Sequence, residues 1–294
     1  MMRSLYSGVS GLRNHQTRMD VIANNIANVN TTAFKSSRTI FQDVYSQTIR
    51  AASGSSTVLG GTNPSQVGLG VRLGTIDTLF TVGATQRTDN PTDQKLDGDG
   101  FFVIDTTGNE PGGLRYTRAG NFYLDNDGML VTADGYFVMG YSLFDPPVPP
   151  ATTGTVKPLP DITDPTAEQN FGKINLSPYT NISFNSKGEI LGYTAAGDKV
   201  IVAQLTIAMF NNNTGLEKVG GSLYDWTPNS GQPNFTIVEH EGAGGISAGA
   251  LEMSNVDLAA EFTDMIITQR GFQANSRSIT VSDTLLEELI NLKR

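Results

Sequence analysis

Residues 5–29 read LYSGVSGLRNHQTRMDVIANNIANV, and apolar side chains recur in this stretch every seven positions. A stretch near the other end of the chain has the same spacing. Sustained period-seven spacing predicts a helix that packs a narrow apolar seam against another helix. We therefore predict a terminal helical domain of residues 1–30 and 252–294, with its two helices paired as in a coiled coil. The predicted seam residues are Leu5, Leu12, Met19 and Ile26, together with Leu251, Leu258, Met265, Phe272, Ile279 and Leu286.

Asparagines crowd the end of the first helical stretch, at Asn24, Asn25, Asn28 and Asn30. Asparagine is a poor helix former because its amide competes for backbone groups. Polar groups in a helix interface fix its register at some cost in stability. Asn24 and Asn28 stand one turn apart on one face, so we add Asn24, Asn25 and Asn28 to the predicted assembly residues. A fraying helix end is the alternative interpretation.

The long middle part of the chain shows the patterns of strands and tight turns. Residues 72–80 alternate in polarity as a half-buried strand does. Asp127-Gly128 separates two short apolar runs and predicts a hairpin, because the pair supplies the positive φ of a primed turn. We predict an extended linker over residues 31–72 and a mostly antiparallel β-rich domain over residues 73–251, which makes the fold class α+β.

Two further features punctuate this middle part. The run Asp145-Pro146-Pro147-Val148-Pro149-Pro150 resembles polyproline and predicts a loop at about residues 145–168. The glycine-rich run around residues 241–249 is expected to end the β region. Ser254 with Asp257 resembles a capping box, which would open the C-terminal helix there.

Composition excludes several classes of function. The net charge of −9 and the pI near 4.7 argue against a nucleic-acid partner, which needs a basic footprint. The chain has no cysteine, and hence no disulfide or thiol nucleophile. No run of 18 apolar residues occurs, so no membrane insertion is expected. The N-terminus shows no cleaved Sec signal, so we expect any export to use another route.

No catalytic, cofactor or metal site stands out in the sequence. The two histidines, His15 and His240, lack a nearby catalytic partner in the sequence pattern. Gly68-Leu69-Gly70 does not continue into a dinucleotide loop. The Asp-Gly pairs at 97–100 and 125–128 lack the spacing that a calcium loop requires. We therefore predict a protein that is not an enzyme and needs no cofactor.

The terminal motifs resemble those of the bacterial flagellar rod–hook axial proteins. The resemblance rests on the runs at 12–35 and 249–277, on Gly100-Phe101-Phe102-Val103-Ile104 and on Tyr116-Thr117-Arg118-Ala119-Gly120. Residues 269–277 and 289–294 resemble the hook protein most; a distal rod subunit is the alternative. A secreted coiled-coil adhesin-like module is the alternative from another class.

The resemblance implies a structural subunit that polymerises with itself into a curved, flexible tube and transmits torque. The paired helices would form the inner core of the tube, and the linker would contact neighbouring subunits. The implied partners are the distal rod, hook cap and hook–filament junction proteins and the flagellar export apparatus. The implied location is the extracellular flagellum. The chain departs from the family at Ala33, where many relatives have glycine, which argues against a positive φ there. It also lacks the large outer domains of some hook proteins.

Overall fold

The computed structural model describes residues 2–55, 60–108, 113–142, 171–177, 179–194, 197–238, 240 and 242–292. The expected proline-rich loop at 145–168 lies outside these residues. The chain divides into two compact units, each made of segments that are far apart in the sequence. The first unit holds Met1–Val29, Lys35–Leu79 and Val256–Arg294, and the second holds Asn30–Phe34 and Phe80–Asn255. The α+β class is confirmed, since a helix near each end brackets a mostly antiparallel β part.

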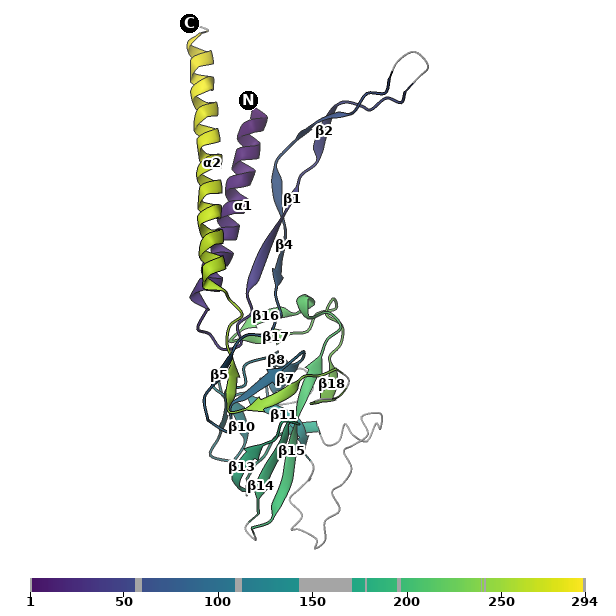
Figure 1. The fold of residues 1–294 in the computed structure, drawn as a ribbon, viewed down its shortest axis with the longest axis vertical. Helices are drawn as coiled ribbons and strands as arrows, with labels where there is room; N and C mark the ends of the chain where they lie inside the picture. Colours follow the sequence, from purple (N-terminus) through teal and green to yellow (C-terminus); the bar gives the residue numbers. More distant parts are fainter. Residues whose placement is uncertain are drawn as a thin grey trace. The chain divides into compact units, whose positions relative to one another are not determined.

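The first unit combines two helices with two antiparallel ribbons (Figure 1). Strand β1 pairs with β4 along its whole length, with a register shift between Ile40 and Phe41, and β2 pairs with β3. Residues 31–72, expected to be a linker, therefore include three whole strands and the start of a fourth. The elements are α1 Met2–Ala27, β1 Ser37–Asp43, β2 Ser46–Arg50, β3 Ser65–Gly68, β4 Val71–Thr78 and α2 Leu258–Asn291.

Helix α2 begins later than the sequence predicts. Its N-cap is Asp257, whose carboxylate accepts hydrogen bonds from the backbone N–H groups of Ala259 (2.9 Å) and Ala260 (3.3 Å). The prediction of Ser254 as the start of the helix was wrong, because Asp257 itself supplies the capping oxygen. Leu251, predicted as the first seam residue of this helix, lies in a strand instead.

The second unit is built on a twelve-stranded sheet with the central order β13-β14-β15-β11-β7-β8-β17-β16. Two small ribbons, β19–β6 and β20–β5, accompany the sheet. The expectation that the glycine-rich run at 241–249 ends the β region was therefore wrong, because β19 lies within the run and β20 follows it. The strands are β5 Thr85–Arg87, β6 Gln94–Asp97, β7 Phe101–Asp105, β8 Leu114–Thr117, β9 Phe122–Leu124, β10 Leu130–Thr132, β11 Phe137–Ser142, β12 Phe171–Lys173, β13 Thr180–Phe184, β14 Glu189–Tyr193, β15 Lys199–Met209, β16 Glu217–Gly220, β17 Leu223–Asp225, β18 Asn234–Ile237, β19 Gly245–Ala248 and β20 Ala250–Glu252.

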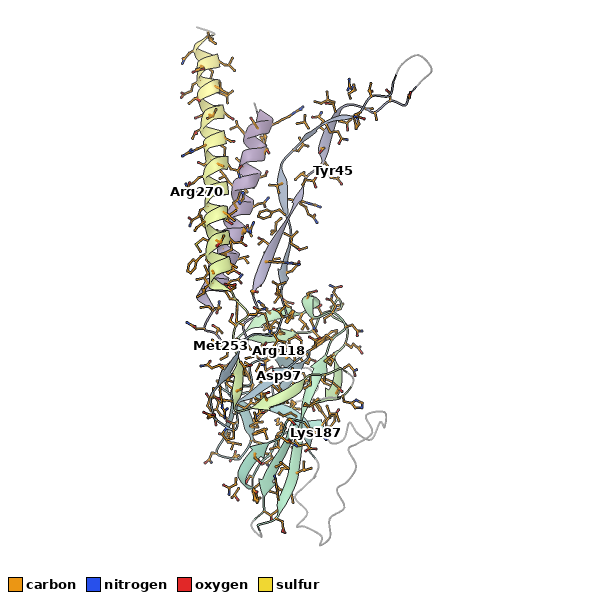
Figure 2. The ribbon with its side chains drawn as sticks, viewed as in Figure 1. Tyr45, Asp97, Arg118, Lys187, Met253 and Arg270 are labelled. Atoms are coloured by element: carbon orange, nitrogen blue, oxygen red, sulfur yellow. The ribbon has the colours of Figure 1, made fainter. Side chains whose placement is uncertain are left out.

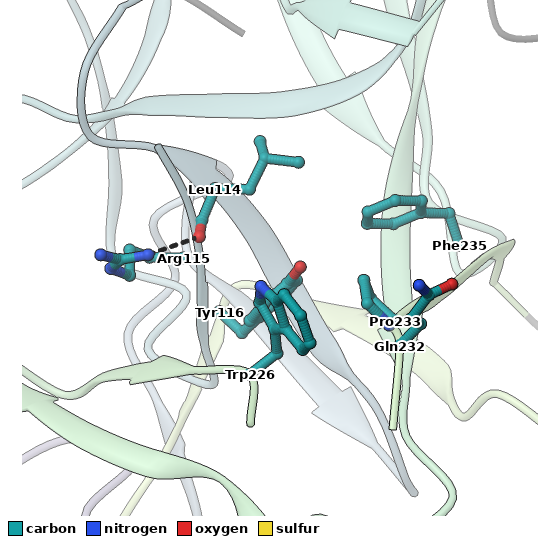
Figure 3. Close-up of a pocket in the computed structure, with 7 residues that line it drawn as sticks. All are labelled: Leu114, Arg115, Tyr116, Trp226, Gln232, Pro233 and Phe235. Atoms are coloured by element: carbon teal, nitrogen blue, oxygen red, sulfur yellow. Dashed lines mark hydrogen bonds between the residues drawn. The ribbon is translucent and has the colours of Figure 1, made fainter. Parts of the chain in front are cut away.

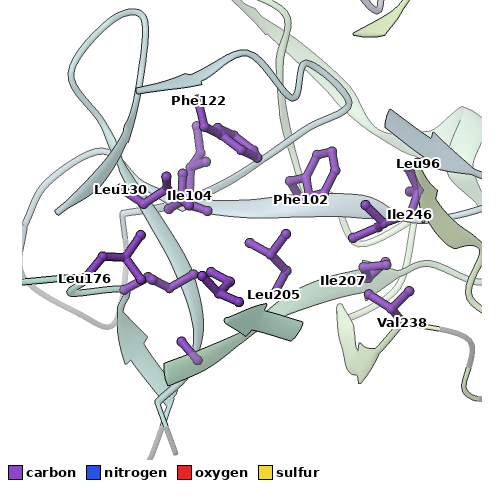
Figure 4. Packing of buried hydrophobic residues seen from close by; sticks show 14 of the residues in the cluster. Leu96, Phe102, Ile104, Phe122, Leu130, Leu176, Leu205, Ile207, Val238 and Ile246 are labelled. Carbon is purple, nitrogen blue, oxygen red and sulfur yellow. The ribbon is translucent and has the colours of Figure 1, made fainter. Parts of the chain in front are cut away.

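Strand β7 is buried on both faces and separates two apolar clusters of the second unit. Phe102 and Ile104 contribute to a large cluster with β15 and its neighbours (Figure 4). Phe101 and Val103 contribute to a smaller one that is rich in aromatic rings. The predicted hairpin is confirmed: β9 pairs with β10, and Gly128 has a φ of 77°. The core of the second unit therefore comes from its own strands.

Candidate assembly interface

Helices α1 and α2 lie side by side in the first unit (Figure 1), and glycines allow a close approach. A methyl group on Gly11 would stand 2.6 Å from the amide nitrogen of Asn275, and one on Gly8 would stand 3.2 Å from Ile279. On the other helix, a methyl group on Gly271 would stand 2.7 Å from the ring of His15. Small residues thus occupy the places where the two helices meet.

Asn25 connects three elements of this unit. Its amide nitrogen donates to the backbone oxygen of Ser37 (2.8 Å) and to the carboxylate of Glu261 (2.9 Å). Its amide oxygen accepts the N–H of Ser37 (3.0 Å). The side chain is 2% exposed. Asn25 therefore joins the end of α1 to the start of β1 and to the first turn of α2.

Electrostatic contacts support the same junction. Burial is the main cause that raises the pKa of Glu261, and the hydrogen bond from Asn25 opposes the shift. One turn away, Arg18 pairs with Asp264 at 3.0 Å. Both side chains of that pair are partly in water, so it contributes little free energy and acts mainly on alignment.

Two polar residues hold α1 against the β1–β4 ribbon. Asn14 donates to the backbone oxygen of Val71 (2.8 Å) and is itself buried. His15 meets the ring of Phe41 edge-on, with a centroid distance of 5.9 Å. Burial, and secondarily the charge of Arg18, lowers the pKa of His15. The buried Nδ1 atom of His15 has no hydrogen-bond partner in the described part of the chain, so the neutral ring is the form that fits this site.

The predicted seam of α1 is only partly buried. Leu5, Leu12, Met19 and Ile26 are all half-buried. The positions of α1 that are buried include Gly8, Gly11, Ile22 and Asn25. The side of α1 that packs within the unit therefore carries small and polar residues as well as apolar ones.

The predicted seam residues of α2 fall into three groups. Met265, Ile279 and Leu286 are half-buried, and Ile279 lies next to Gly8. Leu258 and Phe272 are exposed. Leu251 is buried in the second unit, where β20 pairs with β5.

The sequence prediction missed a polar half of the α2 seam. Glu261, Thr268, Asn275 and Ser282 stand seven residues apart and are buried or half-buried. The hydroxyls of Thr268 and Ser282 donate to backbone oxygens one turn earlier in their own helix (2.7 and 2.8 Å), which satisfies them locally. The period of seven was therefore visible in polar residues, which a search for apolar spacing passes over.

The asparagine prediction also selected different residues from those that the structure buries. Asn24 is exposed, and Asn28 donates to the backbone oxygen of Asn24 at 2.9 Å. These are contacts within one helix end. Asn25 is the asparagine that reaches other elements, and its position three residues after the buried Ile22 was the signal that could have identified it.

Several large apolar side chains of α2 are exposed. We call Phe262, Ile266, Val281, Leu285 and Leu289 the outer surface of α2; their exposed fractions lie between 47 and 58%. Figure 2 shows the side chains along this helix. Phe262 and Ile266 are one turn apart, as are successive members of the group Val281, Leu285 and Leu289. Exposed apolar side chains one turn apart on a helix mark an interaction surface.

Arg118 and Glu252 make buried, non-covalent contacts at the places where the chain enters and leaves the second unit. Arg118, labelled in Figure 2, donates to the carboxylate of Glu252 at 3.1 Å, and both side chains are fully buried. The other carboxylate oxygen of Glu252 accepts the N–H of Gly83 (2.8 Å), and its backbone oxygen accepts the N–H of Ala33 (2.8 Å). Ala33 has a φ of 57°, so the expectation of no positive φ there was wrong. Glu252 thus joins three separate segments.

Chemical sites of other kinds have little support in the described residues. No group of three or more histidine, cysteine, aspartate or glutamate side chains is placed to hold a metal ion in the described ranges. Among the described helices, none is long and apolar enough to cross a membrane. The helix-rich unit with its outer surface is therefore the best candidate site.

Three models of protein families match the chain. Residues 5–35 match the family described as flagella basal body rod protein. Residues 95–192 match the D1 domain of flagellar hook proteins FlgE/F/G. Residues 247–292 match the C-terminal region of flagellar basal body rod FlgEFG proteins. The first match includes most of α1, and the last includes the whole of α2.

Similar proteins extend the match to the whole chain. The chain is 47% identical to the flagellar basal-body rod protein FlgG of Bacillus subtilis over 295 residues, which covers 100% of both chains. It is 36% identical to FlgG of Buchnera aphidicola, covering 99% of this chain and 100% of that relative. It is 32% identical to the flagellar hook protein FlgE of Borreliella burgdorferi, covering 100% of both. The last alignment runs over 446 positions, so that hook protein carries segments that this chain of 294 residues lacks.

Proposed function

The chain belongs to the family of flagellar rod and hook proteins, and we propose that it is a structural subunit whose α2 surface joins it to further copies of itself. Rod and hook subunits assemble into a polymer with other components of the flagellum. The members of the family are structural proteins. The question that remains is which residues make the polymer.

The outer surface of α2 is the observation that supports this proposal. Its five apolar side chains are about half exposed, whereas the side of the helix toward α1 carries Gly271, Asn275 and Ile279. Burying the exposed part of each large side chain contributes on the order of 1 kcal/mol. Contact along this surface therefore contributes several kcal/mol per subunit, and the contribution repeats along a polymer.

The period-seven residues support a coiled-coil pairing of α1 and α2 inside each subunit. Met265, Ile279 and Leu286 supply its apolar half, and Glu261, Thr268, Asn275 and Ser282 supply its polar half. Polar residues at core positions favour one register over others at some cost in stability. In the tube, the helix pair would be innermost and the β-rich unit would be outside.

The comparisons favour a rod subunit over a hook subunit. The relative with 47% identity is a rod protein of matching length, whereas the hook relative aligns over 446 positions. One observation supports the hook assignment: the hook relative also matches 100% of this chain. The adhesin-like alternative has no comparable support. The partners remain those that the family implies: adjoining rod or hook segments, the hook cap, the junction proteins and the export apparatus.

Electron microscopy of concentrated purified protein tests the proposal. We expect tubes from the unchanged protein, straight for a rod subunit and curved for a hook subunit. The double substitution Ile266→Asp with Leu285→Asp places two charges in the outer surface, which costs several kcal/mol per subunit once buried. We expect this variant to form no tubes.

The control adds the same type of charge at an exposed polar position of the same helix, Gln273→Asp. This variant should form normal tubes. The melting of the β-rich unit should be unchanged in both variants, because α2 is not part of its core. Tubes of normal length from the double variant would remove the outer surface of α2 from the interface.

A further inference from the structure

A groove with a volume of about 280 Å³ lies between α1 and the β1–β4 ribbon, within the first unit. We call it the α1 groove; its lining residues include Thr17, Asp20, Val21 and Asn24 of α1 and Ile76 of β4. The four α1 residues stand three, four and seven positions after the first, so they share one face of the helix. The sequence prediction of Asn24 as an assembly residue thus falls on this groove.

The α1 groove combines an apolar patch with one negative charge. Ile76 is 47% exposed, and Val21 is half-buried. Asp20 is the only charged lining residue; it is exposed, and no ion pair engages it within the described part of the chain. Such a surface fits a partner that presents an apolar side chain next to a positive charge.

Helix α2 carries this pattern on the side that is turned away from α1. Ile266 of the outer surface is 58% exposed, and Arg270, labelled in Figure 2, follows one turn later and is exposed. Asn275 faces α1 at Gly11, and Ile266 stands nine residues before it, which is about two and a half helical turns. Ile266 therefore lies on the opposite side of α2 and is not covered by α1 of the same copy.

An open polymer requires two different contact surfaces on each copy. A surface that pairs with itself closes into a symmetric dimer, whereas two different complementary surfaces join copies head to tail and can repeat without end. The outer surface of α2 thus needs a second surface on the neighbouring copy. The α1 groove matches it both in apolar character and in charge.

A second hollow, with a volume of about 330 Å³, lies in the second unit (Figure 3). Its one charged lining residue, Arg115, is positive and already pairs with Asp225 at 3.1 Å. This hollow therefore offers no unpaired negative charge to Arg270, and the α1 groove is the better match.

We propose that Ile266 and Arg270 of one copy dock into the α1 groove of the next copy. Ile266 packs against Val21 and Ile76, and Arg270 pairs with Asp20. This inference rests on the proposed function, because it names the surface that receives α2 of the neighbouring subunit. The contact covers the exposed Ile76 and joins copies head to tail.

Charge reversal tests the pairing of Asp20 with Arg270. Either Asp20→Arg or Arg270→Asp alone places two like charges against each other across the contact. We expect each single variant to raise the concentration at which tubes form by about tenfold or more. The variant that carries both substitutions restores opposite charges, so it should form tubes within about threefold of the concentration that the unchanged chain needs.

The matched control combines Arg270→Asp with Asp43→Arg, at an exposed acid of β1 outside the α1 groove. It has the same net charge as the swapped variant and should not regain tubes. Failure of the swapped variant to recover would overturn the pairing. If the variant with Ile266→Asp and Leu285→Asp also formed no tubes, the proposed function would stand without this groove; normal tubes from that variant would reject both.

Single cysteines give a measure that does not depend on long tubes, because the chain has no cysteine of its own. One preparation carries Val21→Cys and the other carries Ile266→Cys. Under mild oxidation, the mixture should form disulfide-linked dimers at least about tenfold more abundantly than either preparation alone, since a disulfide requires the two side chains to be adjacent. A mixture without linked dimers would overturn the proposal. So would abundant dimers from Ile266→Cys alone, because α2 would then meet α2.

Discussion

The side-chain amide of Asn25 lies 2.9 Å from the carboxylate of Glu261, although 236 residues separate the two in the chain. The same amide satisfies both backbone groups of Ser37. A single buried side chain thus connects the end of the first helix with the beginning of the last and with the ribbon between them. The stability of the helix-rich unit should depend strongly on this residue.

Replacing Asn25 with alanine should lower the free energy of unfolding of the helix-rich unit by about 1–3 kcal/mol, because Ser37 and Glu261 lose buried partners. Thermal melting followed by the helical circular dichroism signal measures the change. Asn24→Ala is the matched control, because Asn24 is exposed and adjacent; it should stay within about 0.5 kcal/mol. Equal effects of the two substitutions would show that Asn25 is only a helix-end residue.

Replacing Glu252 with glutamine should destabilise the β-rich unit by about 3–5 kcal/mol, because the buried charge of Arg118 loses its partner. Denaturant unfolding followed by Trp226 fluorescence measures the effect. The exposed pair Arg87–Asp89 provides the control: Asp89→Asn should change stability by less than about 1 kcal/mol. A small effect of Glu252→Gln would mean that water or a rearranged neighbouring group satisfies the charge of Arg118 in place of the carboxylate.

Gly120→Ala should be strongly destabilising for a steric reason. A methyl group at Gly120 would overlap the backbone oxygen of Gln94, and backbone cannot move aside as a side-chain end can. We expect a loss of about 2–4 kcal/mol, within the range of severe single substitutions. Gly172→Ala is the control, because its methyl group would meet nothing within 4 Å. Similar melting temperatures for the two variants would contradict the packing described at Gly120.

The helix-rich unit should lose stability as the pH falls below neutrality. The pKa of His15 is lowered in the folded state, so the unfolded chain binds this proton at higher pH than the folded chain does. Stability is therefore full above the unfolded value of about 6.5 and declines as pH falls from there toward the folded value. Arg18, which lies beside His15, disfavours the protonated ring further.

The variant His15→Gln identifies the group responsible. Its helical melting temperature should vary less between about pH 7 and pH 5.5 than that of the unchanged chain. Glu261 changes charge at lower pH, and its raised pKa acts in the opposite direction, since it favours the folded state as pH falls. An identical pH profile in the variant would assign the dependence to other groups.

Local features of the fold were predictable because short segments determine them. The turn at Asp127-Gly128, the buried strand β7 and the presence of both helices follow from turn chemistry and from apolar spacing over a few residues. Whether residues 40–45 form a short helix or a strand could not be decided from the sequence, because the pairing of β1 with β4 depends on residues far along the chain, such as Thr78 opposite Ser37.

The errors occurred where distant segments decide the structure. Leu251 continues the period of seven but lies in β20, because β5 provides a partner for it there. Ala33 adopts a positive φ, and its N–H reaches the backbone oxygen of Glu252, a contact that no local pattern reveals. Asn25 is buried and Asn24 is not, because α1 faces both α2 and the β1–β4 ribbon.

The distance in sequence between Asn25 and Glu261 also affects the order of events during biogenesis. A ribosome makes α1 first, and its partner α2 exists only after nearly all of the chain has been made. Closing so long a loop carries an entropic cost that a local helix pair avoids. During synthesis, α1 therefore has no partner helix until α2 has been made. A chain that stops before residue 258 lacks α2 and cannot complete the helix-rich unit. Incorporation through that unit would accept only chains synthesised to completion, so the pairing itself acts as a check on chain integrity.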